Sequence, residues 1–159
     1  MVDEATVART LHILGVVIWI GGVSMATTVA IAAVRRGDLG PDKVKAFHAI
    51  ERRFVWQARA AVLLVGATGF YMTAALDLWG RFADPVFWWM DAMVGVWAIF
   101  MLLLFIGEPF ILHRYFKRWA NSAPDAAFAW LHRAHWILLT LGLITVFGAA
   151  SGSHGWLLL

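Results

Sequence analysis

Four long apolar segments alternate with short polar connectors along this chain. The segments cover residues 6–34, 54–76, 86–112 and 126–152. Each is long enough to cross the hydrocarbon core of a bilayer, which takes about 20 largely apolar residues in a helix. The connectors contain turn and cap residues, including Gly37, Gly40, Pro41 and Asp42 in one and Ala123, Pro124 and Asp125 in another. The pattern predicts an all-α integral membrane protein, with a single four-transmembrane-helix domain over residues 1–159.

Each segment also carries a stripe of small or polar residues at helical spacing. The stripes are His12, Gly15, Trp19, Gly22 and Ala26; Arg59, Val62, Gly66, Gly69 and Thr73; Asp91, Gly95, Ala98, Leu102, Ile106, Pro109 and His113; and Phe128, His132, His135, Leu139, Gly142 and Val146. Membrane helices turn such faces toward one another. The four stripes are therefore expected to line the inside of the bundle.

Composition supports the membrane assignment and narrows the chemistry. Apolar residues make up 62% of the chain and charged residues 14%, whereas globular domains average about 45–50% and 25%. The chain contains no cysteine, which excludes disulfides, iron–sulfur clusters and thiolate catalysis. Any metal would be held by histidine, methionine or carboxylate.

The basic residues are divided unequally between the two ends of the predicted bundle. Ten lie at the end that holds the first and third connectors: Arg35, Arg36, Lys43, Lys45, Arg52, Arg53, Arg114, Lys117, Arg118 and Arg133. Only Arg9 and Arg81 lie at the other end, and Arg59 lies within a segment. By the positive-inside rule, both termini face away from the cytoplasm, so the protein is expected in the bacterial inner membrane with periplasmic termini. The basic patches then report topology and require no nucleic acid as a partner.

The six histidines fall into two groups by depth, because each helical residue advances about 1.5 Å along the axis. His12 and His154 are expected near the outer boundary of the membrane, and His132 and His135 near the inner one. His113 and His48 are expected one to two turns beyond the inner boundary. His12 and His135 have apolar neighbours on both sides, so each should find a partner within the bundle.

Inward histidine beside glycine suits a b-type haem, because imidazole can ligate the iron and glycine lets the flat macrocycle approach the backbone. Arg59 could neutralise a haem propionate, or could form a salt bridge with Glu51 or Glu108. The pair His132 and His135 could equally hold zinc or copper. His12 with Met72, Met90 or Met93 would suit copper(I). A third alternative is a small assembly subunit whose histidines only cap and bridge helices.

Two stretches of the first half resemble a known family. LHILGVVIWIGG, followed later by AFHAIERRFVWQA, is similar to the small four-helix protoporphyrinogen oxidases of the HemJ type. That family has a haem-ligating histidine in its first helix and an acidic-basic stretch at the start of its second. His12 matches the histidine, and Glu51, Arg52 and Arg53 match the stretch. The resemblance covers about the first 75 residues.

The second half departs from that pattern. Where the family has histidine and lysine in its third helix, this chain has Asp91 and Met93 in WWMDAM. The resemblance therefore implies haem binding with oxidase activity absent or weak, and Met93 could itself ligate the iron. The stretches LLFIGEPFILHRYFKRW, LHRAHW and AASGSHG resemble the wider superfamily that includes the copper-resistance D proteins, which shares the architecture but no single activity.

Together these observations predict a b-type haem-binding membrane cytochrome with one haem or two, acting in electron transfer or quinone-linked oxidation. The alternatives are a copper-handling protein and a HemJ-like oxidase. His12 would pair with His154 or Met93 at the outer end, and His113 with His135 at the inner end, with His48 and His132 in reserve. Asp91 could orient His12 or His154. The expected partners are the bilayer, a quinone or another redox protein, and a second copy of the chain.

Overall fold

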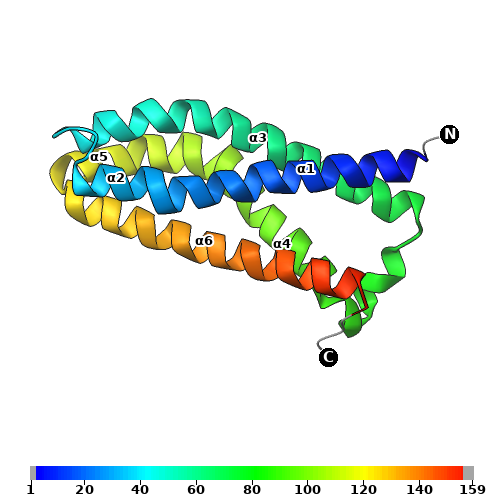
Figure 1. Cartoon of the computed structure of the whole chain (residues 1–159). Coiled ribbons are helices and arrows are strands. Elements are labelled where there is room, and N and C mark those ends of the chain that lie inside the picture. Colours follow the sequence, from blue (N-terminus) through cyan, green and yellow to red (C-terminus); the bar gives the residue numbers. More distant parts are fainter. Residues whose placement is uncertain (1–2, 156–159) are drawn as a thin grey trace.

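The computed structural model describes residues 3–155, and the side chains of all of these except 111–114. The described chain is all-α, with four long helical rods (Figure 1). The first rod runs through α1 (Glu4–Met25), η1 (Ala26–Ala30) and α2 (Ile31–Arg36), the second is α3 (Lys43–Ala75), the third runs through α4 (Trp88–Leu102), η4 (Leu103–Phe116) and α5 (Lys117–Ser122), and the fourth is α6 (Pro124–Ser153). Two short 3-10 helices, η2 (Trp79–Ala83) and η3 (Pro85–Phe87), connect α3 to α4.

Of the predicted turn and cap residues, Gly37, Asp42 and Pro124 end or begin helices as expected, whereas the Asp125 side chain does not cap α6 and pairs with Lys43 instead. Gly37 adopts a left-handed conformation with φ of 80° at the end of α2, which a glycine does without strain. The Asp42 carboxylate accepts a hydrogen bond from the Lys45 amide at 2.9 Å and so caps α3. Pro124 is the first residue of α6, where its missing amide hydrogen has no consequence. The connectors of the sequence pattern are thereby confirmed.

Two helices are longer than the apolar pattern predicts. Helix α3 begins at Lys43 rather than at residue 54, because Asp42 caps it and because Val44, Ala46 and Phe47 pack against a core cluster at that end. The third rod continues through η4 and α5 to Ser122 instead of ending at residue 112. Both extensions carry many basic residues, so a pattern based on hydrophobicity does not assign the extensions to the helices.

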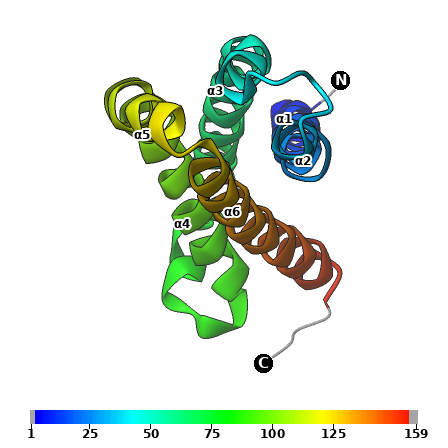
Figure 2. The same cartoon turned by 90° about the vertical axis from the view of Figure 1, so that its left-hand side faces the viewer.

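The four rods pack around two buried clusters. The central cluster contains Trp19, Val62, Phe100 and Leu139, one from each rod, and the rings of Trp19 and Phe100 meet edge to face with centroids 4.9 Å apart. The second cluster, around Phe128, lies at the end of the bundle that holds the first and third connectors. Helix α1 lies alongside α3, and α4 alongside α6, while α6 crosses obliquely to α1 and α3 (Figure 2).

Tryptophans packed on glycines fix the position of α4 between its neighbours. A Cβ added to Gly66 of α3 would lie 2.7 Å from the Trp97 ring, and the Trp97 indole donates to the Val62 carbonyl at 3.0 Å. Added Cβ atoms at Gly148 and Gly152 of α6 would lie 2.6 and 2.5 Å from Trp88 and Trp89. These glycines are therefore contact surfaces for large rings, as small residues at membrane helix interfaces are.

The stripes of three rods face inward, except for Val146 on α6, which is exposed, and that of the third rod does not. On α1 and α3, His12 and Gly69 are half-buried and the other members that line the interior include Gly15, Trp19, Val62 and Gly66. On the third rod the predicted stripe is wrong: Asp91 and Gly95 are exposed, as are Leu102 and Ile106. Trp89, Met90 and Phe100 form its buried side instead. The face of this rod that turns inward is the one whose large rings pack on glycines of α3 and α6.

The outer surface of the bundle is apolar. In the described part of the chain, four helices are long and apolar enough to span a membrane: Glu4–Arg36, Lys43–Ala75, Pro85–Phe110 and Pro124–Ser153, with mean hydropathies of 2.0, 1.3, 2.1 and 1.6. Large apolar side chains such as Val17, Leu102 and Ile137 are exposed along them. A bilayer satisfies such a surface, whereas water does not. The chain is a multi-pass membrane protein.

Candidate functional site

His12 lies on α1 and turns its imidazole toward α3. Its Nδ1 is 3.0 Å from the Val65 carbonyl oxygen and 3.1 Å from Thr68 Oγ1. A carbonyl only accepts, and the Thr68 hydroxyl donates to the Leu64 carbonyl at 2.6 Å. The proton of His12 therefore resides on Nδ1, and Nε2 keeps a lone pair for a ligand. Metal-binding histidines are commonly fixed in this way, with one nitrogen bonded to a backbone carbonyl and the other free.

Gly69 makes room for this imidazole. A Cβ at Gly69 would lie 3.2 Å from His12 Cε1, which is a close contact. The predicted juxtaposition of histidine and glycine between the first two spans is confirmed at this point. A side chain larger than hydrogen at residue 69 would push the ring away from the Val65 carbonyl.

The other residues predicted for the outer end do not join His12 through any described hydrogen bond. His154 is exposed at the end of α6, where its Nδ1 lies 2.8 Å from the Ala150 carbonyl of its own helix. Met93 is half-buried on α4, and Asp91 is exposed. Among the described contacts, Asp91 bonds neither His12 nor His154, so its predicted orienting role has no counterpart in this geometry.

His132 uses both of its ring nitrogens within the protein. Arg35 Nη1, which can only donate, lies 2.7 Å from Nδ1, and Nε2 lies 2.9 Å from the Thr27 carbonyl oxygen. The proton therefore resides on Nε2, and the ring is neutral. With both nitrogens engaged, His132 is poorly suited to ligate a metal unless those two contacts break.

The Thr27 carbonyl is available to His132 because the first rod contains a π-helical turn. In η1 the Ile31 amide donates to the Ala26 carbonyl, five residues back. When α2 resumes four-residue spacing, the next carbonyl, that of Thr27, is left without a helical donor. His132 supplies that donor from α6 and thereby ties the fourth rod to the first.

His135 and His48 both lie in the connector half of the bundle, but their hydrogen-bond partners differ. His135 is half-buried, its Nδ1 lies 3.0 Å from the Leu131 carbonyl of its own helix, and no described residue bonds its Nε2. His48 Nδ1 lies 2.9 Å from the Glu51 carboxylate. The side chain of His113, the predicted partner of His135, is outside the described residues. The inner pairing therefore stays a prediction.

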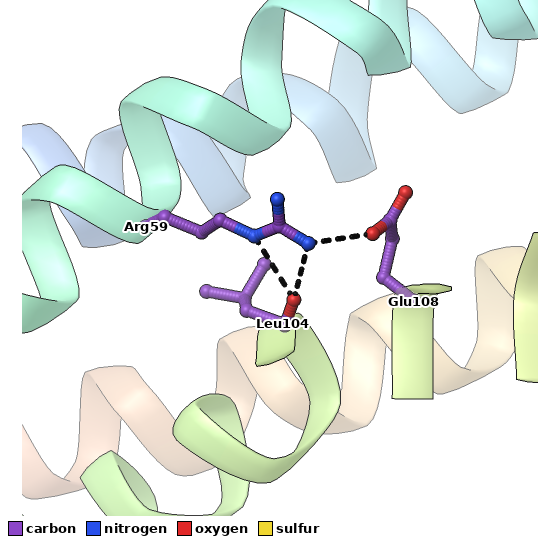
Figure 3. A network of polar contacts seen from close by, with 3 residues as sticks. All are labelled: Arg59, Leu104 and Glu108. Carbon is purple, nitrogen blue, oxygen red and sulfur yellow. Dashed lines mark hydrogen bonds and ion pairs between the residues drawn. The ribbon is translucent and has the colours of Figure 1, made fainter. Parts of the chain in front are cut away.

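Arg59 forms the network shown in Figure 3. Its guanidinium donates twice to the Leu104 carbonyl, at 2.9 and 3.1 Å, and pairs with the Glu108 carboxylate at 2.8 Å. Both charged side chains are about four-fifths buried, with exposures of 18% and 20%. The salt bridge to Glu108 that the sequence suggested is confirmed, while Glu51 pairs with His48.

Pro109 explains why the Leu104 carbonyl accepts from a side chain. Residue 109 lies within η4, and in a ladder of five-residue spacing its amide would donate to the carbonyl of residue 104. Proline has no amide hydrogen, so that carbonyl needs another donor. Arg59 supplies it. At both π-helical segments, then, a histidine or arginine side chain from another rod donates to a carbonyl oxygen that has no backbone amide as its donor.

Two functional features were not visible in the sequence pattern. The carbonyl acceptors at Thr27 and Leu104 depend on π-helical turns, for which Pro109 was the only signal. In the described part of the chain, Trp19 Nε1 is the single buried side-chain polar atom without a hydrogen-bond partner. It lies two turns from His12 on the same stripe, and a buried donor left unpaired costs about 1–3 kcal/mol.

Among the described side chains, those of residues 3–110 and 115–155, no group of three or more from histidine, cysteine, aspartate or glutamate is placed to hold a metal ion. No protein-family model, curated protein or solved structure matches the chain. Its function is therefore argued from the geometry of its own residues.

Proposed function

We propose that this membrane protein binds haem b through His12 and takes part in one-electron transfer or in an oxidation linked to the quinone pool. One observation carries the proposal: Val65 holds the Nδ1–H of His12 and leaves Nε2 free on an inward, half-buried imidazole. That is the protonation state an axial ligand requires. The resemblance of the LHILGVVIWIGG stretch to haem-ligating helices supports the same residue.

The residues around His12 fit such a group in their chemistry. Gly69 presents only hydrogen to the imidazole, so the ring packs closely on α3 and keeps the orientation that frees Nε2. Thr68 and Val65 fix the ring's rotation from α3. Trp19 Nε1 is a buried donor without a described acceptor and could bond a polar group of a bound ligand. A bound haem would supply a one-electron redox centre whose potential depends on its axial ligands.

For the second axial position we propose a residue with a free donor atom at the outer end, either His154 or Met93. His154 Nδ1 contacts a carbonyl of its own helix and leaves Nε2 available at the outer end, and Met93 is the thioether on α4. For a second haem near the connectors, His135 is the preferred ligand, because its Nε2 has no partner among the described residues. His113 and His48 remain candidates, and His132 is the weakest because both of its nitrogens are engaged.

Arg59 acts in this proposal as a structural residue. Its guanidinium is committed to Glu108 and to the Leu104 carbonyl, so a haem propionate would have to displace an ion pair that is largely buried. Breaking such a pair costs about 3–5 kcal/mol. If protein cations neutralise the haem propionates, we therefore assign that role to residues other than Arg59.

Orientation follows from charge. The connector end carries ten of the thirteen basic residues, so we place it in the bacterial cytoplasm and the outer end, with His12, toward the periplasm. A quinone in the bilayer or another redox protein would then exchange electrons with the outer site. A second copy of the chain remains a candidate partner.

The visible spectrum of the purified protein tests the cofactor. We expect a Soret band that shifts on reduction with dithionite, and an increase in that band when hemin is added to a preparation from haem-poor cells. A colourless protein that does not respond to hemin would refute haem binding. Copper found by elemental analysis in that colourless protein would establish the copper-handling alternative.

A growth assay tests the oxidase activity that the HemJ resemblance implies. A strain without protoporphyrinogen oxidase is complemented with this chain and with the variant Asp91→His/Met93→Lys. We expect little or no rescue by the unmodified chain, because Asp91 and Met93 replace the family's histidine and lysine. Full rescue by the unmodified chain would show that these replacements are tolerated.

A further inference from the structure

A cavity of about 420 Å³ opens at the connector end, between α2 and α6. Its lining residues are Ala32, Arg35, Arg36, Asp125 and His132. It lies at the end of the bundle where most basic residues gather, at the depth where the apolar spans end. None of its residues belongs to the His12 site.

The cavity offers hydrogen-bond donors that the protein does not use. Arg35 spends one guanidinium nitrogen on His132, at 2.7 Å, and its remaining N–H groups have no acceptor among the described residues. Arg36 pairs with Asp38 at 2.9 Å, but the two side chains are 66% and 49% exposed, and such pairs are weak. An oxyanion could therefore replace or share the Asp38 contact. Guanidinium groups suit this role because they bind phosphate with two parallel bonds.

The one carboxylate that lines the cavity is already neutralised. Lys43 Nζ lies 2.6 Å from Asp125 Oδ1 and 2.9 Å from the Arg35 carbonyl. Counting Asp38 as well, three cations face two carboxylates here, so the local charge is positive. His132 is neutral in its observed hydrogen bonds and adds no charge.

The surface next to the cavity is apolar on the side of the bilayer. Val29 lies three residues before Ala32 and is 59% exposed, and Trp136 lies one turn after His132 and is 47% exposed. The ring centroids of His132 and Trp136 are 6.2 Å apart. A cationic cavity that continues into an exposed apolar strip matches an amphiphile with a phosphate head, whereas a free phosphate would use the cavity alone.

We propose that this cavity binds the headgroup phosphate of an anionic phospholipid, whose acyl chains lie along Val29 and Trp136. Arg35 and Arg36 donate to the phosphate oxygens. The lipid thereby bridges the first and fourth rods at the connector end, beside the His132 contact with Thr27. This site is independent of the proposed haem and can be present or absent whatever the outcome there.

Native mass spectrometry of the full chain in detergent tests the site with three probes: phosphatidylglycerol, phosphatidylcholine and inorganic phosphate. Because each of the two arginines is expected to contribute about fivefold, we expect phosphatidylglycerol to bind about 25-fold more tightly than phosphatidylcholine. Arg36→Gln should therefore lower the preference for phosphatidylglycerol over phosphatidylcholine about fivefold. The double variant Arg35→Gln/Arg36→Gln should remove most of that preference. Arg36→Gln removes an exposed side chain and keeps the fold, so the test survives if the double variant does not express.

Arg118→Gln is the matched control, because it removes one exposed charge at the same end but outside the cavity. It should leave the preference intact. Equal binding of the two lipids to the unmodified chain, or equal losses in Arg118→Gln and Arg36→Gln, would overturn the site in favour of a general attraction to charge. Inorganic phosphate binding as tightly as phosphatidylglycerol would overturn the lipid as its occupant.

Discussion

The role open to each histidine in this protein depends on which ring nitrogen carries the proton. His12, His135 and His154 each place Nδ1 against a backbone carbonyl, which leaves Nε2 as an acceptor or ligand. His132 donates with Nε2 and accepts with Nδ1, so it acts as a link between rods. Chemically identical side chains thus separate into candidate ligands and structural contacts.

Arg59 offers a residue-scale test of the buried ion pair. Replacing it with alanine leaves Glu108 buried without its cation and the Leu104 carbonyl without a donor. We expect Arg59→Ala to lower the free energy of unfolding by about 3 kcal/mol. A thermal melt in detergent, followed by circular dichroism, measures the change, and Arg118→Ala, exposed on α5, serves as the control with little effect.

A second variant separates the carbonyl from the ion pair. Pro109→Ala restores an amide that can donate to Leu104, so Arg59→Ala should cost less in that background than in the unmodified chain. Equal costs in both backgrounds would show that Arg59 contributes through Glu108 alone.

The sequence predicted where these residues lie in the spans more reliably than it predicted their hydrogen-bond partners. It placed Arg59 inside a span and named Glu108 as one of two partners, because an ionisable group in a membrane needs a counter-charge. It could not predict that Thr27 and Leu104 accept from side chains, because carbonyls become available only where the helix takes five-residue spacing. The tautomers of His12 and His132 likewise depend on partners more than fifty residues away.

At the scale of elements, packing of rings on glycines outweighed the spacing of small residues. Spans, connectors and three inward stripes follow the sequence pattern. The third rod does not, because its glycine at residue 95 faces outward while Trp88, Trp89 and Trp97 occupy hollows at Gly148, Gly152 and Gly66. A pattern of small residues shows that a close approach is possible, but not which helix provides the large partner.

Two glycine substitutions test this packing. In Gly66→Ala the new Cβ would lie 2.7 Å from the Trp97 ring, so we expect a loss of about 1–3 kcal/mol in the free energy of unfolding from overpacking. Gly95→Ala meets no atom within 4 Å and should be neutral or stabilising, because alanine favours helix. Thermal melts of the two variants provide the comparison. Equal destabilisation would contradict the assigned faces of α3 and α4.

At the scale of the whole molecule, the four rods give the protein two chemically different ends. The start of α1 and the end of α6 lie at one end, and both basic connectors at the other (Figure 1). His12 belongs to the half with few basic residues, and His132 with the Arg35 cavity to the half with many. The proposed redox site and the proposed lipid site are therefore separated along the membrane normal.

Reporter fusions test this orientation. Because ten basic residues lie at the connector end and two at the other, we expect alkaline phosphatase fused at either terminus to be active and green fluorescent protein to be dark. A fluorescent fusion at either terminus would reverse the orientation and place His12 on the cytoplasmic side.

Ligand rescue at His12 tests the central claim most directly. The variant His12→Gly removes the imidazole and leaves a space that free imidazole can enter. We expect its reduced-minus-oxidised spectrum to lose or shift the haem signal, and added imidazole to restore it, while Thr10→Gly, an exposed change on the same helix, keeps the unmodified spectrum with or without imidazole. An unchanged spectrum in His12→Gly would contradict the assignment of His12 as the ligand that holds the haem.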